Sequence, residues 1–237
     1  MDAYLLSLYQ FILSYQKYDR IVFMKHSLNP LSTHRAFTML ELIFVIVVVG
    51  ILSFMAASSF QRNTVQEATD QLLSHIRYTQ HLAMMDDKFN AGNANWYRNQ
   101  WHLDIVKDTN TTPNLWVYSV LSANNPGTYA KDPQNPSVFL SGLSTVAEAN
   151  RDKNLQLQAK YGITTITFTN CPTANNATGF SLYFDSLGRP YGNKSTATAP
   201  HTNLLTTTCS IVLSNGNAAE NMTIEISPET GYARAHK

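Results

Sequence analysis

One stretch near the N-terminus constrains this chain more than any other. Residues 35–57 read RAFTMLELIFVIVVVGILSFMAA, and Glu41 is the only charged residue after Arg35. A helix that crosses the hydrocarbon core of a bilayer needs about 20 consecutive apolar residues. The length therefore predicts a membrane-spanning helix over residues 37–57. Two alternatives are a buried core helix and a cleaved secretory signal, which would be processed at the small residues Ala56-Ala57-Ser58.

Charged residues around this stretch indicate its orientation and single out Glu41. Cations such as Lys25 and Arg35 precede the span, and few follow it closely. The positive-inside bias then places the N-terminus in the cytoplasm and the bulk of the chain outside. A carboxylate within a spanning segment costs about 2.5–3.5 kcal/mol, so Glu41 is a functional candidate. The alternative is that Glu41 lies at the interface and reaches water.

The start of the span resembles the processing site of type IV pilins and pseudopilins. A short basic leader is followed by AFTMLELI, beginning at Ala36, and then by the apolar run. The resemblance implies that a prepilin peptidase cleaves between Ala36 and Phe37 and that Phe37 is then N-methylated. It also implies that Glu41 neutralises the N-terminal amine of a neighbouring subunit during filament assembly. Most members have Gly where this chain has Ala36, and we expect processing to survive this change.

The segment that precedes the motif divides into two parts. Residues 24–36 are typical of a short leader, whereas residues 1–23 are rich in Tyr and Leu. We expect translation to start at Met24, and a longer leader is the alternative. In either case residues 1–36 would be removed and residues 37–57 would form the transmembrane segment.

Residues 58–89 are predicted to continue the same helix as an amphipathic segment. Apolar and small residues recur three and four positions apart, at Val65, Ala68, Leu72, Ile76, Thr79 and Ala83. No proline interrupts residues 37–89. The pattern therefore predicts one long N-terminal helix whose first half spans the membrane and whose second half packs on a folded domain.

The remaining residues, 90–237, are predicted to form a β-rich domain. Short runs with alternation or β-branched residues lie at 101–106, 115–121, 163–168, 180–184, 211–213 and 222–226. The polar segments 122–137 and 188–208 are expected to be surface loops. The fold class is therefore α+β, with the long helix packed on a C-terminal antiparallel β domain. The family resemblance implies that this domain has two sheets and is pilin-like.

Two further motifs are similar to the minor pseudopilin H and FimT-type minor pilins, the GspH/FimT family. They are GFSLYF, which begins at Gly179, and IEISPETGYAR, which begins at Ile224. The resemblance implies a minor subunit of a type II secretion or type IV pilus system, located in the bacterial inner membrane with its C-terminal domain in the periplasm. The implied partners are other pilin or pseudopilin subunits, the prepilin peptidase and the inner-membrane assembly platform. An ordinary membrane-anchored periplasmic domain, in which Glu41 is dispensable, is an alternative.

The chain contains two cysteines, Cys171 and Cys209. We expect them to form a disulfide if the domain faces an oxidising periplasm, and two free thiols are the alternative. A metal site that includes His201 is disfavoured, because two Cys and one His do not complete a tetrahedral set of ligands. We therefore expect neither a metal nor a cofactor.

Sequence motifs of enzymes are absent from the chain. It has no HExxH, GxSxG or GxGxxG. The stretch GRPYGNKS, from Gly188 to Ser195, has the wrong spacing for a phosphate-binding loop. We therefore expect a structural subunit that catalyses no reaction.

Binding of DNA during natural transformation is the alternative function, because some FimT-type minor pilins bind DNA through a basic C-terminal tail. Arg234 and Lys237 are the last residues of this chain that are positively charged at neutral pH. Removal of residues 1–36 would take away four of the 17 basic and two of the 16 acidic residues, which changes the net charge from +1 to −1. Such a balance predicts little general attraction to a polyanion.

Overall fold

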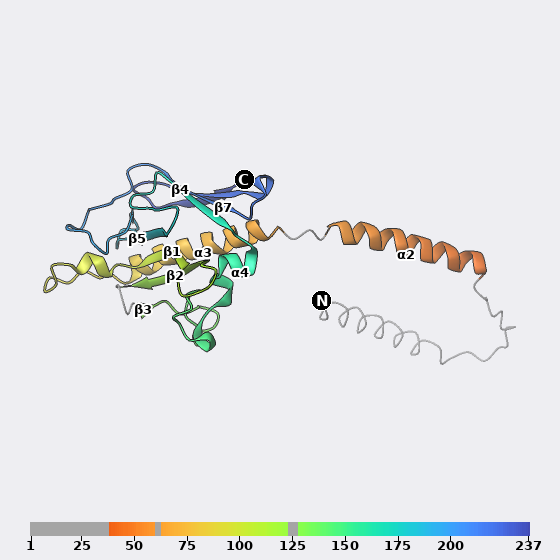
Figure 1. Cartoon of the computed structure of the whole chain (residues 1–237), viewed down its shortest axis with the longest axis horizontal. Helices are drawn as coiled ribbons and strands as arrows, with labels where there is room; N and C mark the ends of the chain where they lie inside the picture. The colour runs from red at the N-terminus through yellow and green to blue at the C-terminus, as the bar shows by residue number, and fades with distance from the viewer. Residues whose placement is uncertain (1–37, 60–62, 123–127) are drawn as a thin grey trace, which may run out of the picture. The chain divides into compact units, whose positions relative to one another are not determined.

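The computed structural model describes residues 38–59, 63–122 and 128–237. The chain divides into two compact units, Met1–Phe60 and Gln61–Lys237, and each is described by itself. Helix α2 belongs to the first unit, and the other described elements belong to the second (Figure 1). The predicted leader, with Ala36 and Phe37 at its cleavage site, lies outside the described residues.

Helix α2 (Met39–Ser59) forms the described part of the first unit. Thr38 precedes it, and the Thr38 hydroxyl accepts a hydrogen bond from the Glu41 backbone N–H at 3.2 Å. The sequence Thr38-Met-Leu-Glu41 is thus an N-terminal capping signal. Apolar side chains are exposed on every side of the helix, from Met39 to Phe54. Among the residues that the structure describes, no helix has the length and hydropathy that crossing a membrane requires.

The expected long N-terminal helix with a transmembrane first half is therefore wrong. Helix α2 ends at Ser59, and a separate helix, α3 (Thr64–Met85), begins five residues later. The physical reason is a second start signal. Asn63 has an extended backbone, and its side chain accepts a hydrogen bond from the Gln66 N–H at 3.0 Å. Asn favours such an N-cap over a helix interior, so the chain starts a new helix there.

Helix α3 is amphipathic, and its apolar face forms part of the core of the second unit. The predicted stripe is confirmed, because all six of its residues are buried: Val65, Ala68, Leu72, Ile76, Thr79 and Ala83. The two threonines that lie on this face, Thr69 and Thr79, bond their hydroxyls to backbone oxygens one turn earlier. Their polar groups are therefore satisfied inside the core.

The first sheet has five antiparallel strands in the order β3-β2-β1-β5-β6. Their bounds are Thr128–Tyr129 for β3, Leu115–Ser122 for β2, His102–Asp108 for β1, Gly179–Phe184 for β5 and Pro190–Tyr191 for β6. Strand β2 is buried along nearly its whole length, because helix α4 (Leu157–Tyr161) also packs against it. Strands β1, β2 and β5 agree with three of the runs expected from the sequence.

The second sheet has four antiparallel strands in the order β4-β7-β8-β9. Their bounds are Thr165–Thr169, Cys209–Ser214, Met222–Ile226 and Ala233–His236. Buried and less buried residues alternate along β8, as expected for a strand with one face on the core. The last strand, β9, was not expected from the sequence.

Helix α3 joins the two sheets into one core. It packs against β1 and β5 of the first sheet and against β7, β8 and β9 of the second (Figure 1). Buried residues of both sheets and of α4 belong to the same hydrophobic cluster as the apolar face of α3. Short 3₁₀ turns complete the described elements, at Trp96–Asn99, Glu148–Asn150, Lys153–Leu155 and Ala218–Glu220.

Candidate functional site

The predicted assembly residue, Glu41, lies in the first turn of α2. A carboxylate at this position interacts favourably with the positive end of the helix dipole. The Thr38 hydroxyl accepts a hydrogen bond from the backbone N–H of Glu41. Glu41 therefore has a local structural role at the start of α2.

Cys171 and Cys209 form a disulfide with Cα atoms 4.7 Å apart, as expected from the sequence. Cys209 is the first residue of β7 and is fully buried, while Cys171 follows the end of the neighbouring strand β4. The bond thus clamps the two strands where their pairing ends. Within residues 38–59, 63–122 and 128–237, no three His, Cys, Asp or Glu side chains are grouped so that they could hold a metal ion.

The predicted DNA-binding cations lie on and beside the last strand. Arg234 belongs to β9 and lies opposite Glu225 of β8 in the sheet register. Its Nε and Nη2 both donate to Glu225 Oε2, at 2.9 and 2.7 Å. Lys237 follows the strand and is exposed. The C-terminal segment is therefore a paired edge strand in which the Arg234 charge already has a partner.

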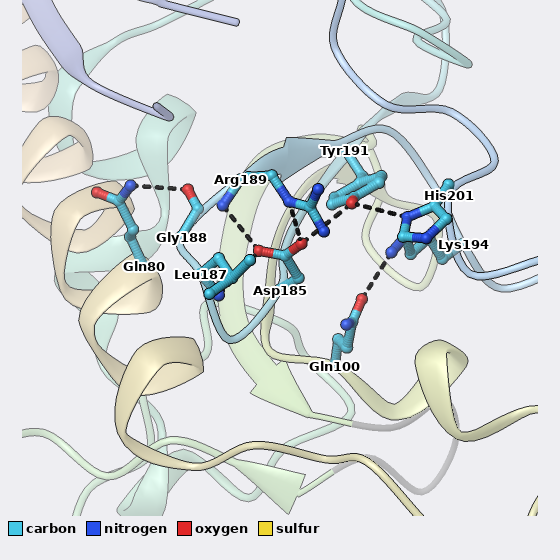
Figure 2. A network of polar contacts seen from close by, with 9 residues as sticks. All are labelled: Gln80, Gln100, Asp185, Leu187, Gly188, Arg189, Tyr191, Lys194 and His201. Atoms are coloured by element: carbon cyan, nitrogen blue, oxygen red, sulfur yellow. Dashed lines mark hydrogen bonds and ion pairs between the residues drawn. The ribbon is translucent and has the colours of Figure 1, made fainter. Parts of the chain in front are cut away.

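A polar network that the sequence analysis missed lies around the turn between β5 and β6 (Figure 2). Its centre is the Asp185 carboxylate. Oδ1 accepts from the backbone N–H groups of Leu187 and Arg189, at 3.0 and 2.9 Å. Oδ2 accepts from Arg189 Nε at 2.7 Å and from the Tyr191 hydroxyl at 3.0 Å. An Asp that bonds the backbone two residues ahead is a common way to fix a tight turn.

The same turn is attached to helix α3. Gly188 adopts a left-handed backbone with φ of +78°, and its carbonyl accepts from Gln80 Nε2 at 2.9 Å (Figure 2). Gln80 also donates to the carbonyl of Thr230, in the turn between β8 and β9, at 2.8 Å. One helix side chain thus holds two turns that come from different sheets.

Lys194 is the most unusual member of the network, because its side chain is 0% exposed. Its Nζ donates to Gln100 Oε1 at 2.7 Å and lies 3.4 Å from the centre of the Tyr191 ring. Burial lowers the pKa of Lys194 to about 7; the Asp185 carboxylate opposes this shift and the Arg189 cation adds to it. The amine therefore titrates near neutral pH, far below the range of an exposed lysine.

Tyr191 connects Lys194 to the Asp185 carboxylate and to His201. Burial, and then the neighbouring Asp185 charge, raise the pKa of Tyr191 to about 12. The hydroxyl therefore keeps its proton, which it donates to Asp185. His201 Nδ1 lies 3.5 Å from the same hydroxyl oxygen (Figure 2).

A cavity of about 80 Å³ opens beside these groups. Its polar lining includes Gln100, Asp185, Arg189, Lys194 and His201, and its apolar lining includes Trp96 and Pro200. An amine, a guanidinium and an imidazole thus border one small space. The Asp185 carboxylate borders the same space, and the Lys194 side chain is 0% exposed, so charges of both signs line the cavity and the amine is shielded from it.

The prediction that residues 188–208 form a surface loop is wrong in this part of the chain. The segment contains β6, and Tyr191, Lys194 and Leu205 within it are buried. The sequence Leu187-Gly188-Arg189-Pro190 does mark the turn between β5 and β6. No local signal marks Lys194 as buried, because its hydrogen-bond partner Gln100 is 94 positions away in the chain.

Comparison with models of known protein families, with curated proteins and with solved structures gives no match to this chain.

Proposed function

We propose that this chain is a minor subunit of a pilin-like filament, of the kind found in type II secretion or type IV pilus systems, and that it catalyses no reaction. Its partners would be other pilin or pseudopilin subunits, the peptidase that processes them and the platform that assembles them. The proposal rests on the motif that begins at Ala36 and on the character of α2.

The observation that carries the proposal is the exposure of α2. Its large apolar side chains, including Leu40, Phe44 and Phe54, are 78%, 67% and 77% exposed. A helix that is apolar all round is normally buried against other apolar surfaces. Identical helices from neighbouring subunits would provide such surfaces in a filament. Glu41, at the start of the helix, would then meet the N-terminal amine of the next subunit.

The second unit has features that suit a subunit exported from the cytoplasm. The disulfide between Cys171 and Cys209 is typical of proteins that fold in an oxidising compartment. The rest of the unit is a small core of two sheets on an amphipathic helix. We propose that this unit lies on the outside of the filament.

The test is assembly of the full-length chain in its native host. The Glu41→Ala variant is expected to accumulate to the normal level but to lose at least tenfold from the sheared filament fraction, because an unpaired amine would be left among apolar helices. Asp70→Ala is the matched control, since Asp70 is an exposed acid on helix α3. Equal amounts of wild type and Glu41→Ala in the filament fraction would refute the proposal.

The DNA-uptake alternative receives no support from the described residues. Arg234 is ion-paired with Glu225, and only Lys237 of the two candidate cations lies outside a pair. Non-specific DNA binding needs several cations that can reach phosphates together. We therefore do not propose it as a second function.

A further inference from the structure

We propose that one end of the second unit is a docking surface for an uncharged apolar helix of a neighbouring filament subunit, of the kind that α2 provides. The surface, which we name the apolar patch, consists of Met84, Met85, Phe89, Leu187 and Tyr232. The inference rests on the proposed filament function, and it names the part of the second unit that meets the helix of a neighbour.

The apolar patch gathers residues from three segments of the chain. Met84 and Met85 are the last residues of α3, and Phe89 follows them closely. Leu187 lies in the β5–β6 turn, and Tyr232 lies in the turn between β8 and β9. Within the part of the second unit that the structure describes, these five are the exposed large apolar residues. Single exposed apolar residues are normal on protein surfaces, whereas here all of them belong to one region.

Contacts of α3 bring the two turns together. Gln80 lies one helical turn before Met84, and it donates to the Gly188 carbonyl at 2.9 Å and to a carbonyl of the β8–β9 turn at 2.8 Å (Figure 2). A Cβ atom on Gly188 would lie 3.3 Å from Met84 Sδ. The turns that carry Leu187 and Tyr232 are therefore held against the same end of the helix.

Phe89 joins the patch through Trp96. The two rings pack edge to face, with their centres 5.2 Å apart. Trp96 and Leu187 line the same cavity of about 80 Å³. The members of the patch are therefore neighbours in space, although they lie up to 148 positions apart in the chain.

The patch has the size and the composition of the apolar part of a protein interface. Its five residues are 49% to 73% exposed, which leaves roughly 500 Å² or more of their surface in water. One side of a standard interface covers about 800 Å², and somewhat more than half of that area is apolar. Four of the five residues are methionine or aromatic, the types that are enriched at interface cores.

Helix α2 has the chemistry that such a patch requires. Its large side chains from Met39 to Phe54 are exposed, and it has no charged residue after Glu41. Contact between such a helix and the patch removes apolar area from water on both sides, and it desolvates no charge of the helix beyond Glu41. Because helix and patch are different surfaces, the contact runs head to tail and can propagate into a filament, whereas contact between two patches would close as a dimer.

Acidic residues beside the patch disfavour a lipid surface. Asp87 lies between Met85 and Phe89 in the sequence, Glu229 lies in the same turn as Tyr232, and both acids are exposed. Their charges repel the anionic headgroups of a membrane. An uncharged helix meets no such repulsion.

The experiment is photo-cross-linking of the full-length chain in its native host, with p-benzoylphenylalanine in place of Leu187, which is 73% exposed. The sheared filament fraction is irradiated, and the products are mapped by mass spectrometry. We expect cross-links between two chains, with the partner peptide inside the apolar N-terminal helix of a neighbouring subunit. Lys160 is the control position, because it is exposed on α4, which packs beside the first half of α3 at Gln71. The same probe there should give at least tenfold less of this product.

The outcomes separate this inference from the proposed function. Absence of the wild-type chain from the filament fraction would overturn both. Presence of the chain in filaments, with cross-links that map only to other regions or only within one chain, would overturn the docking surface alone. The probe in place of Tyr232 is the second variant. Loss of both variants from the filament fraction at normal cellular levels, while the Lys160 variant assembles, would support the docking surface.

Discussion

Replacement of Lys194 by Met should remove a pH dependence of stability that the buried amine creates. Met has a similar length and no branching, and it cannot carry a charge. The change leaves Gln100 Oε1 without its donor, which costs about 1–3 kcal/mol at every pH. The informative quantity is therefore the slope of the unfolding free energy against pH, to which this constant loss does not contribute.

The sign follows from the direction of the pKa shift. Burial lowers the pKa of Lys194 from 10.5 in the unfolded chain to about 7 in the folded protein. Between these values the unfolded state holds one more proton, so stability rises with pH, by up to about 1.4 kcal/mol per unit. Below pH 7 Lys194 is charged in the folded protein, so the full cost of burying that charge lowers the unfolding free energy. Between pH 7 and pH 9 the free energy of unfolding should increase by about 2 kcal/mol.

The other groups whose pKa values are shifted do not change the unfolding free energy between pH 7 and pH 9. Burial lowers the pKa of His75 below 6.5, so its effect on stability appears in more acidic solution. The pKa of Tyr191 is raised to about 12 and that of Tyr118 is raised as well, so stability is lost above pH 10, where unfolded tyrosines ionise first. The lowered carboxyl pKa values of Asp86 and Asp108 act below pH 4.

The assay is guanidinium unfolding of the full-length chain in mild detergent and Tris chloride, with the disulfide intact. Tryptophan fluorescence reports on the second unit, because Trp101 and Trp116 are both buried there. Wild type should gain about 2 kcal/mol from pH 7 to pH 9, and Lys194→Met should be flat. Lys153→Met, at an exposed lysine, should keep the wild-type slope. A flat wild-type curve, or an unchanged slope in Lys194→Met, would refute the reasoning.

Three further predictions concern other parts of the chain. Gly231→Ala should lose about 2 kcal/mol or more of unfolding free energy, because the backbone there has φ of +64° and an added Cβ would lie 2.6 Å from the Gly188 carbonyl oxygen. Gly216→Ala should lose less in the same assay, since nothing lies within 4 Å of its Cβ position. Mass spectrometry of the mature protein from the native host should find an N-methylated Phe37 as first residue, and a chain that still carries the leader would contradict the processing site. The full-length chain should give no gel shift with duplex DNA at low salt, because Arg234 is already paired, and a shift that Arg234→Ala abolishes would contradict this.

The elements that the sequence predicted well are those whose own residues carry the signal. The apolar stripe of α3 recurs at helical spacing, and every member is buried. Strand β8 is predicted at residues 222–226 and runs over Met222–Ile226, because its apolar residues alternate with polar ones. The cap at Asn63 was also present in the sequence, and it separates α3 from α2. Periodicity alone does not reveal this break, because no proline interrupts residues 37–89.

The elements that were missed depend on partners far away in the chain. Strand β9 contains little that is typical of a strand, and it exists because β8 pairs with it and because Glu225 holds Arg234. The burial of Lys194 also depends on residues that are far away in the chain. Its burial follows from Gln100 and from the Tyr191 ring, and a sequence of polar and small residues around it is equally typical of a surface loop.

Two features of the molecule conflict with ordinary folding rules in opposite ways. Helix α2 exposes apolar side chains that would be more stable if buried, and Lys194 buries an amine that would be more stable in water. Sequences usually satisfy such local rules, and the exceptions tend to lie at functional sites. We propose that a neighbouring subunit covers the apolar side chains of α2, whereas Gln100 and the Tyr191 ring already hold the Lys194 amine inside the second unit. Because the two features belong to different compact units, Lys194→Met should leave filament assembly intact, and a loss of assembly in this variant would show that the two features act together.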